Sequence, residues 1–85
     1  MTVYTWDAEA AGGSARGVCA SQRRAKRAVS AWMREHRADR AVLEERHLVT
    51  EAELGTSYAP ARRRWTARLR RDGRVSWTEQ PVRNC

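Results

Sequence analysis

The alternation of apolar and polar residues between Arg62 and Gln80 predicts a β-hairpin. The segment RRRWTARLRRDGRVSWTEQ has strand-like runs on both sides of Asp72-Gly73, a dipeptide typical of hairpin turns. A two-residue loop would divide the apolar residues between the two faces of the hairpin. A three-residue loop over 71–73, with Gly73 in the left-handed conformation, brings them to one face. The pattern therefore predicts the three-residue loop, with an apolar face of Trp65, Ala67, Leu69, Val75 and Trp77.

The other face of this hairpin is predicted to be cationic. It would carry Arg64, Arg68 and Arg70 from the first strand and Arg74 from the second, with Thr and Ser between them. An ordinary solvated sheet face is the simpler interpretation. Arg70 is expected to face Arg74, however, and directly opposed like charges destabilise a hairpin. Binding of an anion would explain the arrangement, and a two-stranded ribbon can enter the major groove of DNA.

A helical period between residues 22 and 37 predicts an amphipathic helix with Ser21 as its N-cap. The first turn is basic, so its side chains oppose the helix macrodipole. Free backbone N–H groups in the same turn suit a phosphate, which makes Arg23 and Arg27 further candidate binding residues. A solvated helix face is the alternative interpretation. The predicted apolar stripe is Ala25, Ala28, Val29, Trp32 and His36, with Met33 at its margin.

The ends of the chain complete a single small domain, residues 1–85. Thr2–Trp6 is rich in β-forming residues and predicts a short strand. The small residues of 7–20 predict a loop, and 82–85 after the last strand are expected to form a flexible tail.

The middle segment, 38–53, leaves two alternatives open. Its apolar residues fit a helical period, but a strand near Val42–Val49 would complete an otherwise thin sheet, and we favour the strand. The expected fold class is therefore α+β, with a short N-terminal strand, one amphipathic helix and an antiparallel basic hairpin at the C-terminus. The helix would pack on the apolar sheet face and bury Trp32, Trp65 and Trp77.

The net charge of the chain is +7, and it is unevenly distributed. Two basic segments, 16–37 and 62–74, flank the acidic segment 38–61. Clustered positive charge suits a polyanion such as nucleic acid, an anionic membrane surface or an acidic protein. Arg outnumbers Lys sixteen to one, and the codon bias of a GC-rich genome would account for part of that excess.

No motif for catalysis, metal binding or cofactor binding is present in the sequence. Cys19 and Cys85, taken with His36 and His47, match no metal-ligand spacing, so free thiols are expected. There is no Walker loop or dinucleotide-binding signature. The acidic N-terminus does not match a secretory signal, and no apolar run approaches the ~18 residues that span a membrane. We therefore expect a cytoplasmic, non-enzymatic protein without a cofactor or a membrane partner.

The Arg- and Ala-rich composition and the hairpin RRRWTARLRRDGRVSW resemble small uncharacterised proteins of Streptomyces-like actinobacteria. The resemblance covers mainly the last third of the chain and implies no activity and no site. From the residues themselves, the leading hypothesis is an accessory or regulatory protein that binds nucleic acid, either DNA or RNA. The alternative is a small adaptor that docks an acidic protein partner, which the acidic segment 38–61 favours. The candidate binding residues are Arg64, Arg68, Arg70, Arg74, Arg23 and Arg27.

Overall fold

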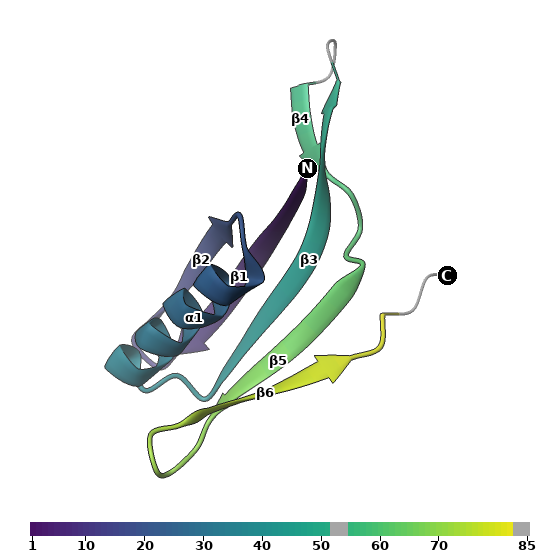
Figure 1. Ribbon diagram of the computed structural model, residues 1–85. Helices are drawn as coiled ribbons and strands as arrows, with labels where there is room; N and C mark the ends of the chain where they lie inside the picture. The colour runs from purple at the N-terminus through teal and green to yellow at the C-terminus, as the bar shows by residue number, and fades with distance from the viewer. Residues whose placement is uncertain (52–54, 83–85) are drawn as a thin grey trace.

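The computed structural model describes residues 1–51 and 55–82, which form an antiparallel sheet with one helix on one of its faces (Figure 1). The order of the five main strands is β2-β1-β3-β5-β6, and β4 pairs with the far end of β3. The helix connects β2 to β3, which confirms the α+β class. The elements are β1 Thr2–Ala10, β2 Gly13–Cys19, α1 Gln22–His36, β3 Arg40–Glu51, β4 Gly55–Tyr58, β5 Arg63–Leu69 and β6 Val75–Gln80.

The C-terminal hairpin of β5 and β6 has the predicted register. Leu69 lies opposite Val75, and Gly73 has a φ of 84°. The Gly73 N–H donates to the Arg70 carbonyl at 3.0 Å, and the Arg70 N–H donates to the Arg74 carbonyl at 2.7 Å. These two bonds define a three-residue loop whose last residue is left-handed, as the apolar pattern predicted.

The N-terminal hairpin corrects two predictions. The expected loop over 7–20 is instead the second half of β1, a turn at 11–12 and strand β2, so the expected strand Thr2–Trp6 was also too short. Gly17 lies directly opposite Trp6, and a Cβ atom at Gly17 would overlap the Trp6 indole. The glycine that suggested a loop therefore makes room for an aromatic ring on the neighbouring strand.

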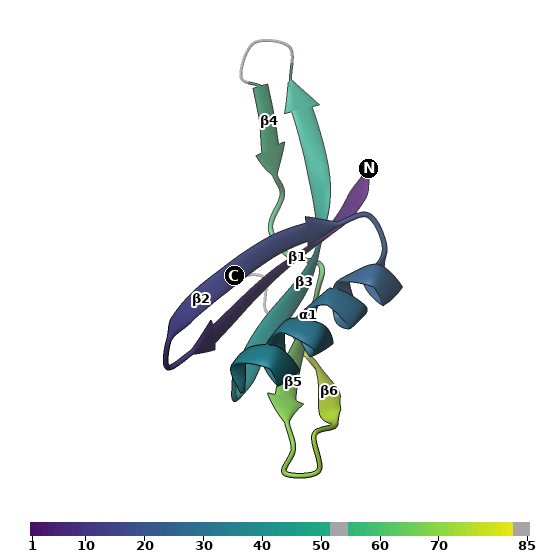
Figure 2. The ribbon, with the colours of Figure 1, turned by 90° about the vertical axis from the view of Figure 1, so that its left-hand side faces the viewer.

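The middle segment forms a strand, as the favoured alternative required. The first part of β3 pairs with β1 on one side and with β5 on the other, so it is the central strand of the sheet. Pairing on both sides outweighs the helical period of this segment. Beyond the main sheet, β3 pairs with β4 and forms an arm that extends past the other strands (Figure 2). Residues 52–53 of the segment and 83–85 of the expected tail lie outside the described residues.

Helix α1 has the predicted bounds within one residue. The Ser21 hydroxyl accepts a hydrogen bond from the Arg24 backbone N–H at 3.1 Å, and Arg37, with a φ of 52°, caps the C-terminus of the helix after His36. The buried face of the helix is rotated about the helix axis relative to the predicted apolar stripe. Met33, expected at the margin, is fully buried at the centre with Ala25 and Val29, whereas His36 is exposed.

The core lies between α1 and one face of the sheet. Alanines on three strands lie beneath the helix, and their small side chains let it pack closely on the sheet. Trp65 is 4% exposed and belongs to the core, as predicted. Trp32 and Trp77 are only half-buried at its edge, so the prediction that all three would be largely buried holds for Trp65 alone. The alanines are Ala8, Ala41 and Ala67.

Candidate nucleic-acid interface

The sheet face opposite α1 is not covered by any described element, and we call it the open face (Figure 1). Side chains alternate between the two faces of a strand, so Arg64, Thr66 and Arg68 of β5 point to the open face. Arg40 of β3 lies directly opposite Arg68. These side chains and Thr78 line a shallow polar groove over β3, β5 and β6.

The C-terminal end of α1 meets the tip of the β5–β6 hairpin. The Arg34 Nε donates a hydrogen bond of 3.1 Å to the Gly73 carbonyl, which anchors the hairpin loop to the helix. Arg37, Arg70 and Arg71 line a hollow at the same junction. A cluster of arginines thus continues from the open face around the end of the sheet to the helix. We call this cluster, together with Arg74 opposite Arg70 in the hairpin, the arginine end: Arg34, Arg37, Arg40, Arg68, Arg70, Arg71 and Arg74.

Most of these guanidinium groups have no acidic partner. Within the described part of the chain, the single ion pair of the arginine end joins Arg74 to Asp72 at 3.9 Å. Both side chains are exposed, so the pair is weak. Asp39 lies in the hollow and Glu9 lies across from Arg40 on β1, but neither carboxylate is within 4 Å of a guanidinium of the arginine end. The arginine end therefore presents concentrated positive charge to solvent.

Arg64, which is adjacent on the open face, has a structural partner instead. Its Nε and a terminal nitrogen donate to Glu44 at 3.0 and 2.8 Å. Arg46 donates to the other oxygen of the same carboxylate at 2.9 Å. Burial by itself would raise the pKa of the Glu44 carboxyl, but the hydrogen bonds and charges of the two arginines outweigh it and lower that pKa. The positive charge of Arg64 is thus largely neutralised by Glu44 within the fold.

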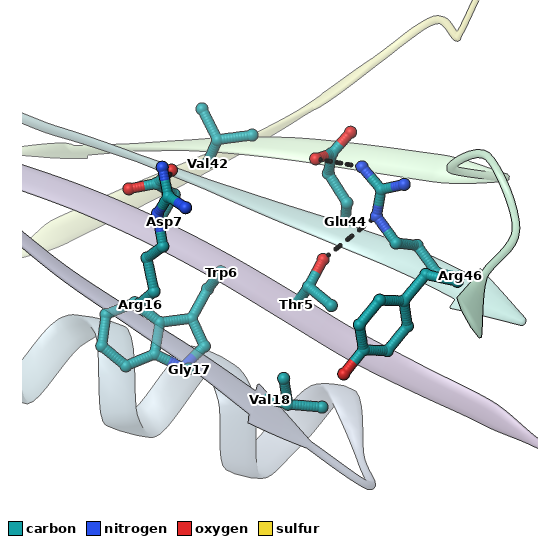
Figure 3. A pocket seen from close by; sticks show the side chains of 10 residues that line it. Thr5, Trp6, Asp7, Arg16, Gly17, Val18, Val42, Glu44 and Arg46 are labelled. Carbon is teal, nitrogen blue, oxygen red and sulfur yellow. Dashed lines mark hydrogen bonds and ion pairs between the residues drawn. The ribbon is translucent and has the colours of Figure 1, made fainter. Parts of the chain in front are cut away.

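The acidic side of the open face lies over β1. Asp7 pairs with Arg16 at 3.3 Å, and Arg46 donates to the Thr5 hydroxyl at 3.2 Å (Figure 3). A pocket lined by these side chains and Val18 opens here. Its polar groups mostly bond to one another, which indicates a role in holding the sheet together. Over β1 the open face is therefore acidic, with Asp7 paired and Glu9 exposed, and toward the arginine end it is basic and largely unpaired.

The structure separates the two groups of candidate residues proposed from the sequence. Arg64, Arg68, Arg70 and Arg74 lie together along the hairpin, as expected. Arg23 and Arg27 are exposed on α1, which packs on the opposite face of the sheet, so they do not converge with the hairpin arginines.

A third basic residue of the first helical turn has a packing role. Lys26 is half-buried, and its Nζ lies 5.6 Å from the Trp65 ring centre and 5.4 Å from that of Trp77. Such cation–π contacts stabilise the fold and leave this ammonium less available to a ligand.

Sequence reasoning missed four arginines of the arginine end. They lie on α1, in the turn after it, at the start of β3 and in the hairpin loop, so only tertiary structure brings them together. Arg40 could have been found by pairing the predicted strand in 38–53 with the first strand of the hairpin. The register of that pairing places Arg40 opposite Arg68. The missed residues are Arg34, Arg37, Arg40 and Arg71.

The described residues contain no group of three or more His, Cys, Asp or Glu side chains that could hold a metal ion. Within the same ranges, no helix is long and apolar enough to cross a membrane. Comparison with known proteins found no matching family model, no matching curated protein and no matching solved structure.

Proposed function

We propose that this protein binds nucleic acid through the arginine end and acts as a non-enzymatic accessory or regulatory protein. One observation carries the proposal. Arginines from α1, β3 and the β5–β6 hairpin meet at one end of the sheet, and all but Arg74 lack a carboxylate within 4 Å in the described part of the chain. A basic patch assembled from distant segments is the electrostatic footprint expected of a polyanion site.

The chemistry of the side chains supports phosphate as the group that is bound. Guanidinium groups donate in a planar fork that matches two phosphate oxygens, and they stay charged at any physiological pH. Thr66 and Thr78 line the same groove, and hydroxyl groups are common phosphate partners. The groove has no carboxylate of its own lining it. The Glu44 carboxylate binds Arg64 from outside the lining, so the donors of Arg40, Arg68 and the two threonines are the ones left for a ligand.

The direct test is binding of a labelled 20-base-pair DNA duplex, followed by fluorescence anisotropy at about 50 mM salt. The variant R68Q/R70Q/R74Q removes three charges from the arginine end and should weaken binding by on the order of 10-fold or more. The matched control is R23Q/R24Q/R27Q, which removes three exposed charges from the other side of the molecule. The control should stay within about 3-fold of wild type. Equal losses in the two variants would contradict the site.

A small adaptor protein that docks an acidic partner is the second candidate. The observation that favours it is the acidic β1 side of the open face, where Asp7 and Glu9 lie beside the basic side. A surface with both signs of charge suits a protein partner with the complementary pattern. Absence of any wild-type binding to duplex DNA, to oligo-dT and to RNA at about 50 mM salt would support this candidate over the first.

A further inference from the structure

We infer that the nucleic acid is double-helical and is held by its phosphate backbones, an inference that rests on the proposed function. The observation behind it is the position of the aromatic side chains. Proteins that hold single strands stack the bases on exposed aromatic rings. The chain has four Trp, two Tyr and no Phe, and all six aromatic residues lie within the described ranges. The position of each of these rings relative to the arginine end is therefore known.

All four tryptophans pack on the side of the sheet that α1 covers, and the Trp6 ring also reaches the pocket over β1, away from the arginine end. Trp65 is buried, and Lys26 lies over both its ring and that of Trp77. Trp32 belongs to the helix itself and stacks on His36, with 4.4 Å between the two ring centres. The Trp6 indole lies over Gly17 and packs against the core between α1 and the sheet. No tryptophan is thus presented on the open face beside the arginine end.

The two tyrosines are also unsuitable as stacking groups at this site. Tyr4 points to the helix side, where its hydroxyl donates to Glu45 at 3.1 Å. Tyr58 is 51% exposed, but it lies at the arm, opposite Leu48. Leu48 follows Arg40 by eight residues along β3, which corresponds to about 26 Å at the rise of a strand. On the open face, the arginine end therefore combines strong positive charge with no Trp or Tyr ring on which a base can stack.

This combination favours a duplex for two physical reasons. Duplex DNA carries one negative charge per ~1.7 Å of its axis, so counterion release on binding is larger than for a single strand. A duplex is also stiff, whereas a flexible single strand loses conformational freedom when it is bound and needs stacking to compensate. Contacts limited to phosphates imply little discrimination between base sequences.

The arginine end also turns a corner of the molecule. Arg40 and Arg68 face outward from the open face, whereas Arg34 and Arg37 come from the C-terminal end of α1, where it meets the hairpin loop. Positive charge on both sides of an edge can approach phosphates from more than one direction. The two backbones of a duplex supply such phosphates, and this geometry therefore agrees with the position of the aromatic residues.

The test compares a 20-base-pair duplex with a 40-nucleotide oligo-dT, which have nearly the same number of phosphates, on the full chain at about 50 mM salt. The duplex should bind at least ~10-fold more tightly, and saturating unlabelled duplex should leave the tryptophan emission unchanged. Equal or tighter binding of oligo-dT, or quenching of the tryptophans by it, would overturn the inference while leaving the proposed function standing. If neither ligand binds, the proposed function fails, and this inference fails with it.

The variant Tyr58→Leu provides a second check, because Tyr58 is an exposed ring on the open face away from the arginine end. Both affinities should stay within about 2-fold of wild type, since the ring takes no part in binding. A loss of oligo-dT binding of 10-fold or more in this variant would show that a base stacks on the arm, and would overturn the inference.

Discussion

Arg40 and Arg68 lie directly opposite each other on neighbouring strands, with both side chains on the open face of the sheet. Opposed like charges on a sheet are destabilising, by roughly 0.2–1 kcal/mol for such a cross-strand pair. Arg64, four residues earlier on the same strand and on the same face, is instead paired with Glu44. Of these two arginines on β5, Arg64 therefore stabilises the fold and Arg68 destabilises it.

This difference predicts opposite effects of one substitution at the two positions. Arg68→Thr should raise the free energy of unfolding by up to about 0.5 kcal/mol, because it removes the repulsion and adds a good strand-forming residue. Arg64→Thr should lower it by about 0.5–1 kcal/mol, because Glu44 loses a partner. Urea unfolding followed by tryptophan fluorescence measures both values. A destabilisation by Arg68→Thr as large as that by Arg64→Thr would contradict the assignment of Arg68 to binding.

The Glu44 carboxylate predicts a pH dependence of stability. Its pKa in the folded state is lowered below the ordinary value of 4.5 by Arg64 and Arg46, against the opposing effect of burial. The stabilisation is therefore fully present above about pH 4.5, where the unfolded chain is also ionised, and it is lost as the pH falls through the folded-state pKa. Glu44→Gln should thus be less stable than wild type at pH 7, and the difference should shrink at pH 3.

The measurement is urea unfolding of wild type and Glu44→Gln at both pH values. Glu9→Gln is a suitable control, because Glu9 is exposed and has no ion pair within 4 Å among the described residues. Its difference from wild type should be small at both pH values. A stability difference for Glu44→Gln that is the same at pH 7 and pH 3 would show that the carboxylate charge does not contribute.

The contact between Gly17 and Trp6 predicts that the N-terminal hairpin tolerates no side chain at position 17. Gly17→Ala should destabilise the protein by about 1–3 kcal/mol, because the new Cβ overlaps the Trp6 indole and forces it to move. Gly12→Ala in the neighbouring turn is the control, since a Cβ there meets no atom within 4 Å. Thermal unfolding followed by circular dichroism measures both. Equal melting temperatures for the two variants would mean that the indole does not pack on Gly17.

The sequence was most informative where two independent signals agreed. In the C-terminal hairpin, Asp72-Gly73 indicated a turn and the alternation of apolar residues selected the three-residue loop, which the structure has. In the N-terminal hairpin, Ala and Gly carry little strand propensity, so β2 was mistaken for a loop. The reason for the glycine is a tertiary contact, because a side chain at position 17 would overlap the Trp6 indole on the neighbouring strand.

The candidate site could be predicted only in part, for the same reason. Alternation along one hairpin was enough to place Arg68 and Arg70 on a single surface. Arg34 and Arg37 join them because the helix end packs against the hairpin loop, and Arg40 joins through pairing of β3 with β5. Local patterns do not contain these long-range contacts. They also suggested Arg23 and Arg27, which the helix carries to the other side of the molecule.

The most direct test of the central claim is the salt dependence of binding to duplex DNA. Each phosphate contact contributes about −0.9 to the slope of log affinity against log salt concentration. Binding at the arginine end predicts a steep slope for wild type, a slope about 2–3 smaller in magnitude for R68Q/R70Q/R74Q, and the wild-type slope for R23Q/R24Q/R27Q. A wild-type slope in the hairpin variant would contradict binding at the arginine end.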